Sequence, residues 1–155
     1  MLDVDDTDRP LIRMTLAGDG EPDDGAAFID RIETLLAAGE RFVLMLDERL
    51  ALAVFGDGRW RRLLPWALRR RRRLAHNCAA VAVTVTDLAL PRVERTTTAL
   101  AHLLPAPLST FFEVSMAEQW VHSRLASGHG QPVPARLGDW QPALASYRVL
   151  GSDPQ

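Results

Sequence analysis

The chain has 155 residues, of which 47% are hydrophobic and 25% are charged, and its formal net charge is −2. This composition is typical of one globular domain with a sizeable core rather than of a disordered chain. All 18 basic residues are Arg, which excludes enzymes that depend on a catalytic or phosphate-binding Lys, such as pyridoxal-phosphate enzymes, lysine aldolases and standard P-loop NTPases.

Cysteine content and apolar runs indicate a cellular location. Cys78 is the only cysteine, which excludes a disulfide framework and the zinc motifs that need several cysteines. No apolar run approaches the roughly 20 residues that span a bilayer. The acidic start of the chain lacks the basic and apolar regions of a signal peptide. We therefore expect a cytoplasmic protein with no membrane span.

Hydrophobic periodicity predicts a strand, a helix and a second strand in the first third of the chain. Polar and apolar residues alternate over Leu11–Leu16, which is typical of a half-buried strand. A helix follows Pro22 and ends at Gly39. Its apolar residues recur at helical spacing, namely Phe28, Ile32, Leu35 and Leu36. The apolar run of residues 42–46 is too short for a helix and predicts a strand covered on both faces.

Strands and helices continue to alternate up to residue 128. In chain order we expect a helix over residues 59–77, a strand over 79–86, a helix over 91–104, a strand over 111–114 and a helix between Ser115 and Gly128. Pro65 either kinks the first of these helices or begins its main part. Ser115 and Glu118 have the spacing of a capping box at the start of the last one.

This alternation predicts a single α/β domain over residues 11–128. Its sheet has four to five strands, is mostly parallel and carries helices on its faces, because right-handed crossovers connect successive parallel strands. An acidic segment, residues 1–10, precedes the domain, and a Pro/Gly-rich tail, residues 129–155, follows it. The spacing of aromatic and apolar residues in the tail allows a short helix that packs on the domain or inserts into a partner groove.

Charge is distributed unevenly along the chain. Residues 1–30 hold nine acidic residues and two arginines, whereas residues 59–73 hold eight arginines and no acidic residue. The imbalance predicts contact between the two regions, or a charged partner for one of them. The arginines that we assign to a partner-binding surface are Arg59, Arg62, Arg69, Arg70, Arg72 and Arg73.

Three interpretations of these arginines are open. They form a solvated helix face that the chain's own acids neutralise in part, a docking surface for an acidic protein, or a site for nucleic acid or an anionic membrane. The third is disfavoured because the net charge is negative and few aromatic residues are interleaved to stack on bases. The expected partner is therefore an acidic protein surface or a second copy of the chain.

Three features together carry a family resemblance. A helix leads into the string VLMLD of residues 43–47, an Arg-rich helix with Trp60 runs into the string CAAVAV of residues 78–83, and a closing strand precedes the string AEQW of residues 117–120. In these features residues 11–126 resemble the STAS-like domains, which are small α/β modules related to sporulation anti-sigma-factor antagonists. The resemblance implies a partner-binding module without catalytic activity.

The chain departs from that family at one position. The resemblance implies a phosphorylatable Asp-Ser pair on the loop that starts a helix after a central strand. Residues 48–58, which follow Asp47, contain no Ser or Thr. We therefore expect no phospho-switch there, and a divergent member whose partner need not be an anti-sigma kinase.

Asp47 and Asp87 are the candidates for a second kind of site. Both follow predicted strands, so both are expected at the carboxyl edge of the sheet, where parallel sheets place ligands. There they would bind Mg²⁺, act as an acid/base pair, or simply cap turns. The histidines lack the spacing of a metal site on one element, and no Gly-x-Ser-x-Gly elbow is present. The sequence thus predicts no catalytic residue, no metal ligand and no cofactor.

Two functions follow from these observations. The first is a non-catalytic protein-binding or regulatory module that acts through its Arg-rich helix. The alternative is a small enzyme or ligand-binding protein that uses a crevice near Asp47 and Asp87.

Overall fold

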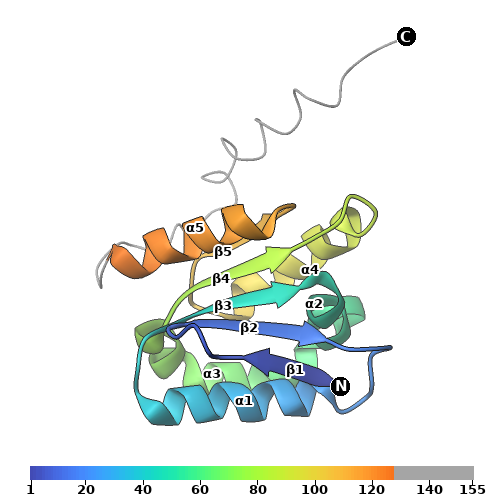
Figure 1. Cartoon of the computed structure of the whole chain (residues 1–155). Coiled ribbons are helices and arrows are strands. Elements are labelled where there is room, and N and C mark those ends of the chain that lie inside the picture. Colours follow the sequence, from blue (N-terminus) through green and yellow to red (C-terminus); the bar gives the residue numbers. More distant parts are fainter. Residues whose placement is uncertain (128–155) are drawn as a thin grey trace.

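The computed structural model describes residues 1–127, apart from the side chains of Ala99, His102 and Leu103. It confirms the predicted α/β fold, with one five-stranded, mostly parallel sheet flanked by helices (Figure 1). The predicted tail, residues 129–155, lies outside the described residues. The strands are β1 (Leu2–Asp5), β2 (Leu11–Leu16), β3 (Phe42–Asp47), β4 (Cys78–Thr84) and β5 (Leu108–Phe111).

The strands lie in the sheet in the same order as along the chain, from β1 to β5. β1 runs antiparallel to β2, and the other neighbouring strands are parallel. β3 lies at the centre, where Leu44 pairs with Ile12 of β2 and Val81 of β4. Every residue from Phe42 to Leu46 is buried, which confirms a strand covered on both faces.

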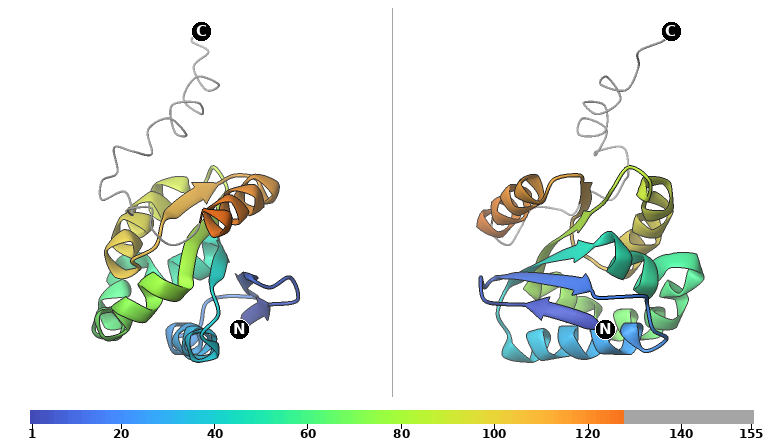
Figure 2. Two further views of the ribbon diagram at one scale, coloured as in Figure 1. Left: turned by 90° about the vertical axis from the view of Figure 1, so that its left-hand side faces the viewer. Right: turned by 45° about the vertical axis from the view of Figure 1, so that its right-hand side comes forward.

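The helices divide unequally between the two faces of the sheet (Figure 1, Figure 2). They are α1 (Asp24–Ala38), α2 (Glu48–Phe55), the 3-10 turn η1 (Gly56–Gly58), α3 (Trp60–Asn77), α4 (Leu90–Leu103) and α5 (Val114–Ala126). The connections from β2 to β5 all step to the next strand in the same direction, so crossovers of one hand place α1 to α4 on one face. α5 follows the last strand and packs on the opposite face of β3 and β4.

The core follows this division. The larger cluster lies between the sheet and α1 to α4, and in α1 it takes in the stripe Phe28, Ile32, Leu35 and Leu36, as predicted. Gly39 ends α1 in the left-handed conformation, with φ 71°, which confirms the predicted stop. A smaller cluster on the other face joins the strands to Ala117 and Val121 of α5.

One strand and one α-helix were not predicted. β1 lies inside residues 1–10, the predicted acidic N-terminal segment, so the sheet starts earlier than expected. Leu2 and Val4 pack on the larger cluster while Asp3 and Asp5 are exposed, and alternating charges of this kind are common on edge strands. α2 is also additional. It has only eight residues and is followed directly by glycines, which obscured its short apolar stripe.

The last strand and helix differ from the prediction in their bounds. β5 ends at Phe111, although the apolar residues that follow it had suggested a strand over residues 111–114. α5 then begins at Val114, so Ser115 lies inside the helix and the predicted capping box is wrong. Glu118 instead pairs with Arg13 of β2, at 2.7 Å between Oε1 and Nη2.

Pro65 lies in the second turn of α3 and does not begin the helix. Within residues 1–127, no helix combines the length and the apolar composition that crossing a bilayer requires.

Candidate functional site

The arginine-rich segment forms α3, and the two sides of this helix differ in character. Leu63, Trp66, Ala67 and Leu74 recur at helical spacing and are at most 8% exposed, because they face the sheet and the neighbouring helices. Arg70 falls in the same stripe, three residues after Ala67 and four before Leu74. The run of five arginines therefore places one guanidinium at the edge of the core.

Arg70 has a partner in α1, which packs against α3. Its Nε donates to Oε1 of Glu33 at 2.6 Å, and the indole Nε1 of Trp66 donates to the same oxygen at 2.7 Å. The Arg70 guanidinium, with the Trp66 indole, holds the pKa of the Glu33 carboxyl below its ordinary value. A carboxylate that accepts two hydrogen bonds from one helix fixes α1 against α3, so Arg70 has a structural role.

The outer side of α3 carries exposed arginines, in contrast to Arg70. We call Arg62, Pro65, Leu68, Arg69 and Arg72 the outer face of α3, because their spacing places them along one exposed stripe. Within residues 1–127, no carboxylate lies within ion-pair distance of the three arginines of this face. Leu68 is 58% exposed among them. The face thus combines one exposed apolar side chain with positive charge that no carboxylate of the described residues neutralises.

The remaining predicted arginines have intermediate roles. Arg59 precedes the first turn of α3, and its Nη1 donates to the carbonyl of Ala53 at 2.9 Å. It therefore satisfies a backbone acceptor near the end of α2. Arg73 is exposed but lies near enough to Glu33 to help lower the pKa of that carboxyl. The six arginines predicted as one surface thus lie in four different environments.

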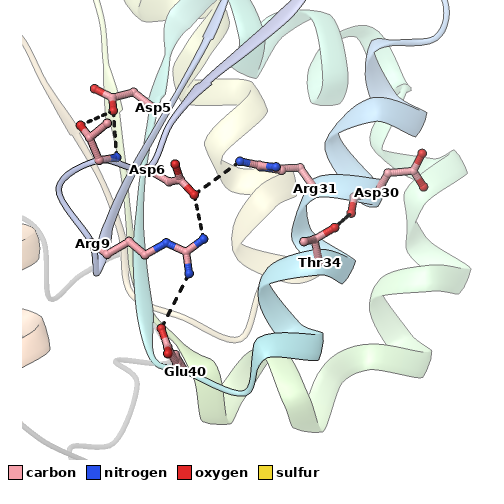
Figure 3. A network of polar contacts seen from close by, with 8 residues as sticks. Asp5, Asp6, Arg9, Asp30, Arg31, Thr34 and Glu40 are labelled. Atoms are coloured by element: carbon pink, nitrogen blue, oxygen red, sulfur yellow. Dashed lines mark hydrogen bonds and ion pairs between the residues drawn. The ribbon is translucent and has the colours of Figure 1, made fainter.

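The acidic N-terminal region does not neutralise α3. Figure 3 shows Asp6 between Arg9, at 2.7 Å, and Arg31, at 3.6 Å, and Arg9 also lies 3.8 Å from Glu40. In the described part of the chain, no acidic residue of the region 1–30 pairs with an arginine of the region 59–73. The predicted contact between these two regions is not seen, and within residues 1–127 the α3 arginine that forms an ion pair, Arg70, pairs with Glu33.

Asp47 lies where it was predicted, at the carboxyl end of β3, and it also acts as the N-cap of α2. Its Oδ1 accepts from the backbone N–H of Leu50 at 2.9 Å, and its Oδ2 accepts from that of Leu16 at 3.5 Å. Both carboxylate oxygens are therefore directed to backbone donors, which is the capping role that the sequence left open.

Asp87 follows β4 in an exposed loop. Among residues 1–127, no hydrogen bond or ion pair joins it to Asp47. Glu48 makes the connection between α2 and this loop, since its carboxylate accepts from the backbone N–H of Thr86 at 2.7 Å and from the Thr86 hydroxyl at 3.0 Å.

A hollow of about 190 Å³ lies elsewhere, between α2, η1 and the start of α3 on one side and α4 on the other. Its lining combines apolar and charged side chains, namely Leu52, Phe55, Asp57, Gly58, Trp60, Arg92, Arg95 and Thr96. This pocket was not predicted, because its residues come from two stretches far apart along the chain, residues 52–60 and 92–96.

Two further kinds of site were considered in the sequence, a reactive thiol at Cys78 and a metal site of acidic residues. Cys78 is 3% exposed at the start of β4, and burial raises the pKa of its thiol to about 12. It is therefore held as a protonated, buried side chain. In residues 1–127, no three His, Cys, Asp or Glu side chains are grouped so that they could hold a metal ion.

Sequence reasoning missed Glu33 and Glu48 as positioning residues. Glu33 follows directly after Ile32 in the apolar stripe of α1, so an acid bordering a buried face could have been recognised as needing a partner. Which arginine it meets depends on how α1 and α3 pack.

Comparison of the chain with protein-family models, with curated proteins and with solved structures finds no match.

Proposed function

We propose that the protein is a non-catalytic binding or regulatory module that docks an acidic protein partner on the outer face of α3. The observation that carries the proposal is the set of exposed arginines around the exposed Leu68, which have no carboxylate of residues 1–127 within ion-pair distance. Positive charge speeds encounter with an acidic surface, and an apolar side chain in its midst adds buried area to the complex.

The chemistry of the face favours this partner over others. Its residues include no aromatic ring on which a base could stack, so single-stranded nucleic acid is less well suited. Two copies of the same basic face would repel each other in a symmetric dimer, which disfavours a second copy of the chain at this surface.

The buried Cys78 agrees with a cytoplasmic location, which we include in the proposal.

The STAS-like interpretation remains part of the proposal. It is supported by the position of α2, which begins directly after the central strand β3 and is capped by Asp47. The alternative, an enzyme or ligand-binding protein with a crevice at Asp47 and Asp87, has less support because the carboxylate of Asp47 is bound to backbone donors.

The proposal is tested with a short acidic peptide, acetyl-hexaglutamate amide, as the probe. The double variant R69Q/R72Q should bind it several-fold more weakly than the unaltered chain, and the affinity of the unaltered chain should fall as salt is raised. The matched control R49Q/R124Q removes the same charge from α2 and α5. Equal losses in the two variants would mean that net charge, and not the outer face, determines binding.

A further inference from the structure

The pocket between α2, η1, α3 and α4 has the composition of an anion-binding site. Arg92 and Arg95 project from α4 at its rim and are exposed, and the side chain of Phe55, which is 2% exposed, forms part of its apolar wall. The ring of Trp60 lines the side formed by α3. Two guanidinium groups that line the same hollow favour a negatively charged group, because each offers a planar set of donors that fits a carboxylate.

The size of the pocket limits what it can hold. Its volume of about 190 Å³ is below the roughly 300–1,000 Å³ of pockets that enclose a drug-sized ligand or cofactor. The pocket is therefore suited to a single side chain rather than a nucleotide.

Asp57 is the acidic residue that lines this pocket, and its carboxylate is held only weakly. Its Oδ2 lies 3.6 Å from Nη2 of Arg92, which is too long for a hydrogen bond, and its side chain is 76% exposed. Asp57 also adopts φ 51°, in the left-handed region that few residues other than Gly enter. Gly58 follows with φ 79°, so these two residues turn the chain from α2 into α3. A loosely held carboxylate is one that another carboxylate can replace.

Arg61 lies between the pocket and the outer face of α3. The guanidinium carbon of Arg61 lies 5.6 Å from the ring centre of Trp60, which lines the pocket. Arg61 precedes Arg62 and is one helical turn from Pro65, and both belong to the outer face. A peptide that lies along the outer face can therefore extend one end to the pocket.

We infer that the pocket anchors one carboxylate of the acidic partner, which takes the place of Asp57 beside Arg92 and Arg95. The inference rests on the proposed function and specifies where the partner is held most closely. Asp57 is then a competitor within the chain, and its removal should strengthen binding.

The test again uses acetyl-hexaglutamate amide, with binding followed by NMR through the indole signal of Trp60, assigned with a Trp60→Phe variant. Asp57→Asn removes the competing charge, and Asn also tolerates the left-handed conformation. We expect it to tighten binding about two- to fivefold, as the loss of an exposed ion pair allows. Its matched control is Asp19→Asn, which removes an exposed charge outside the pocket. Arg95→Gln should weaken binding about two- to tenfold, as for a charge-assisted hydrogen bond, with Arg49→Gln as its control.

The possible results separate the two proposals. The pocket is supported if Asp57→Asn binds the peptide more tightly while Asp19→Asn does not, and if Arg95→Gln weakens binding more than Arg49→Gln. A shift of the Trp60 signal on binding is also expected. If the peptide binds and R69Q/R72Q weakens it, but the pocket variants match their controls and the Trp60 signal stays in place, the pocket is overturned and the proposed function stands. If the unaltered chain does not bind the peptide, both proposals fall. Circular dichroism checks that each variant is folded.

Discussion

The inner and outer sides of α3 use the same residue type in opposite ways. On the inner side, Arg70 shares the Glu33 carboxylate with Trp66, and all three contribute to the contact between two helices. On the outer side, Arg69 and Arg72 are exposed and have no carboxylate within ion-pair distance in the described residues. Position relative to the buried stripe, and not the run of arginines itself, therefore separates structural residues from candidate binding residues.

The largest difference should appear between two apolar residues of α3. Trp66→Ala removes a buried ring and one hydrogen bond to Glu33, so we expect the free energy of unfolding to fall by about 3–5 kcal/mol. Leu68→Ala, on the outer face, should change it by less than about 0.5 kcal/mol. Urea unfolding of the two variants measures both. Similar losses would show that Leu68 is packed and that the outer face is not free.

Glu33→Gln should have an intermediate effect. Gln keeps an acceptor but loses the charge, so Arg70 remains at the edge of the core without its ionic partner. Because both side chains are partly exposed, we expect a loss of about 1 kcal/mol in the free energy of unfolding. A double-mutant cycle with Arg70→Gln isolates the pair. A coupling energy near zero would remove the structural role assigned to Arg70.

The same pair predicts a dependence on pH. The pKa of Glu33 is lowered in the folded chain from an ordinary value of 4.5, so the unfolded chain binds the proton more readily. The stabilisation is fully present above pH 4.5 and is lost as the pH falls through the lower, folded-state pKa. The difference in unfolding free energy between the unaltered chain and Glu33→Gln should therefore shrink as the pH falls below 4.5. A difference that stays constant would mean that Glu33 is not held as a carboxylate.

The smallest effect on stability is expected on the outer face. In the triple variant R62Q/R69Q/R72Q, repulsion between neighbouring arginines is relieved and no ion pair among the described residues is broken. The free energy of unfolding should stay constant or rise by a few tenths of a kcal/mol. Thermal unfolding at low and high salt tests this, because the gain should disappear when salt screens the repulsion. A clear loss would indicate that these arginines are neutralised within the chain.

Patterns that depend on one element were predictable from the sequence. The apolar stripe of α1, its stop at Gly39 and the buried run of β3 follow from local periodicity alone. β1 was missed because Asp3 and Asp5 interrupt it, and such charges face solvent only once the strand pairs at the edge of the sheet.

The candidate site depended on contacts between distant residues. The sequence located the arginines but could not assign Arg70 to Glu33, since the rotation of α3 relative to α1 is set by packing. The pocket of Trp60, Arg92 and Arg95 likewise forms only when α3 and α4 come together.

The most direct test compares two neighbouring residues, Arg69 and Arg70, each replaced by Gln and measured for both unfolding free energy and binding of acetyl-hexaglutamate amide. The charge removed is the same, so any difference reflects the side of the helix. We predict that Arg69→Gln weakens binding and leaves stability unchanged, whereas Arg70→Gln lowers stability and has the smaller effect on binding. Equal effects of the two substitutions on both quantities would contradict the division of α3 into a structural side and a binding side.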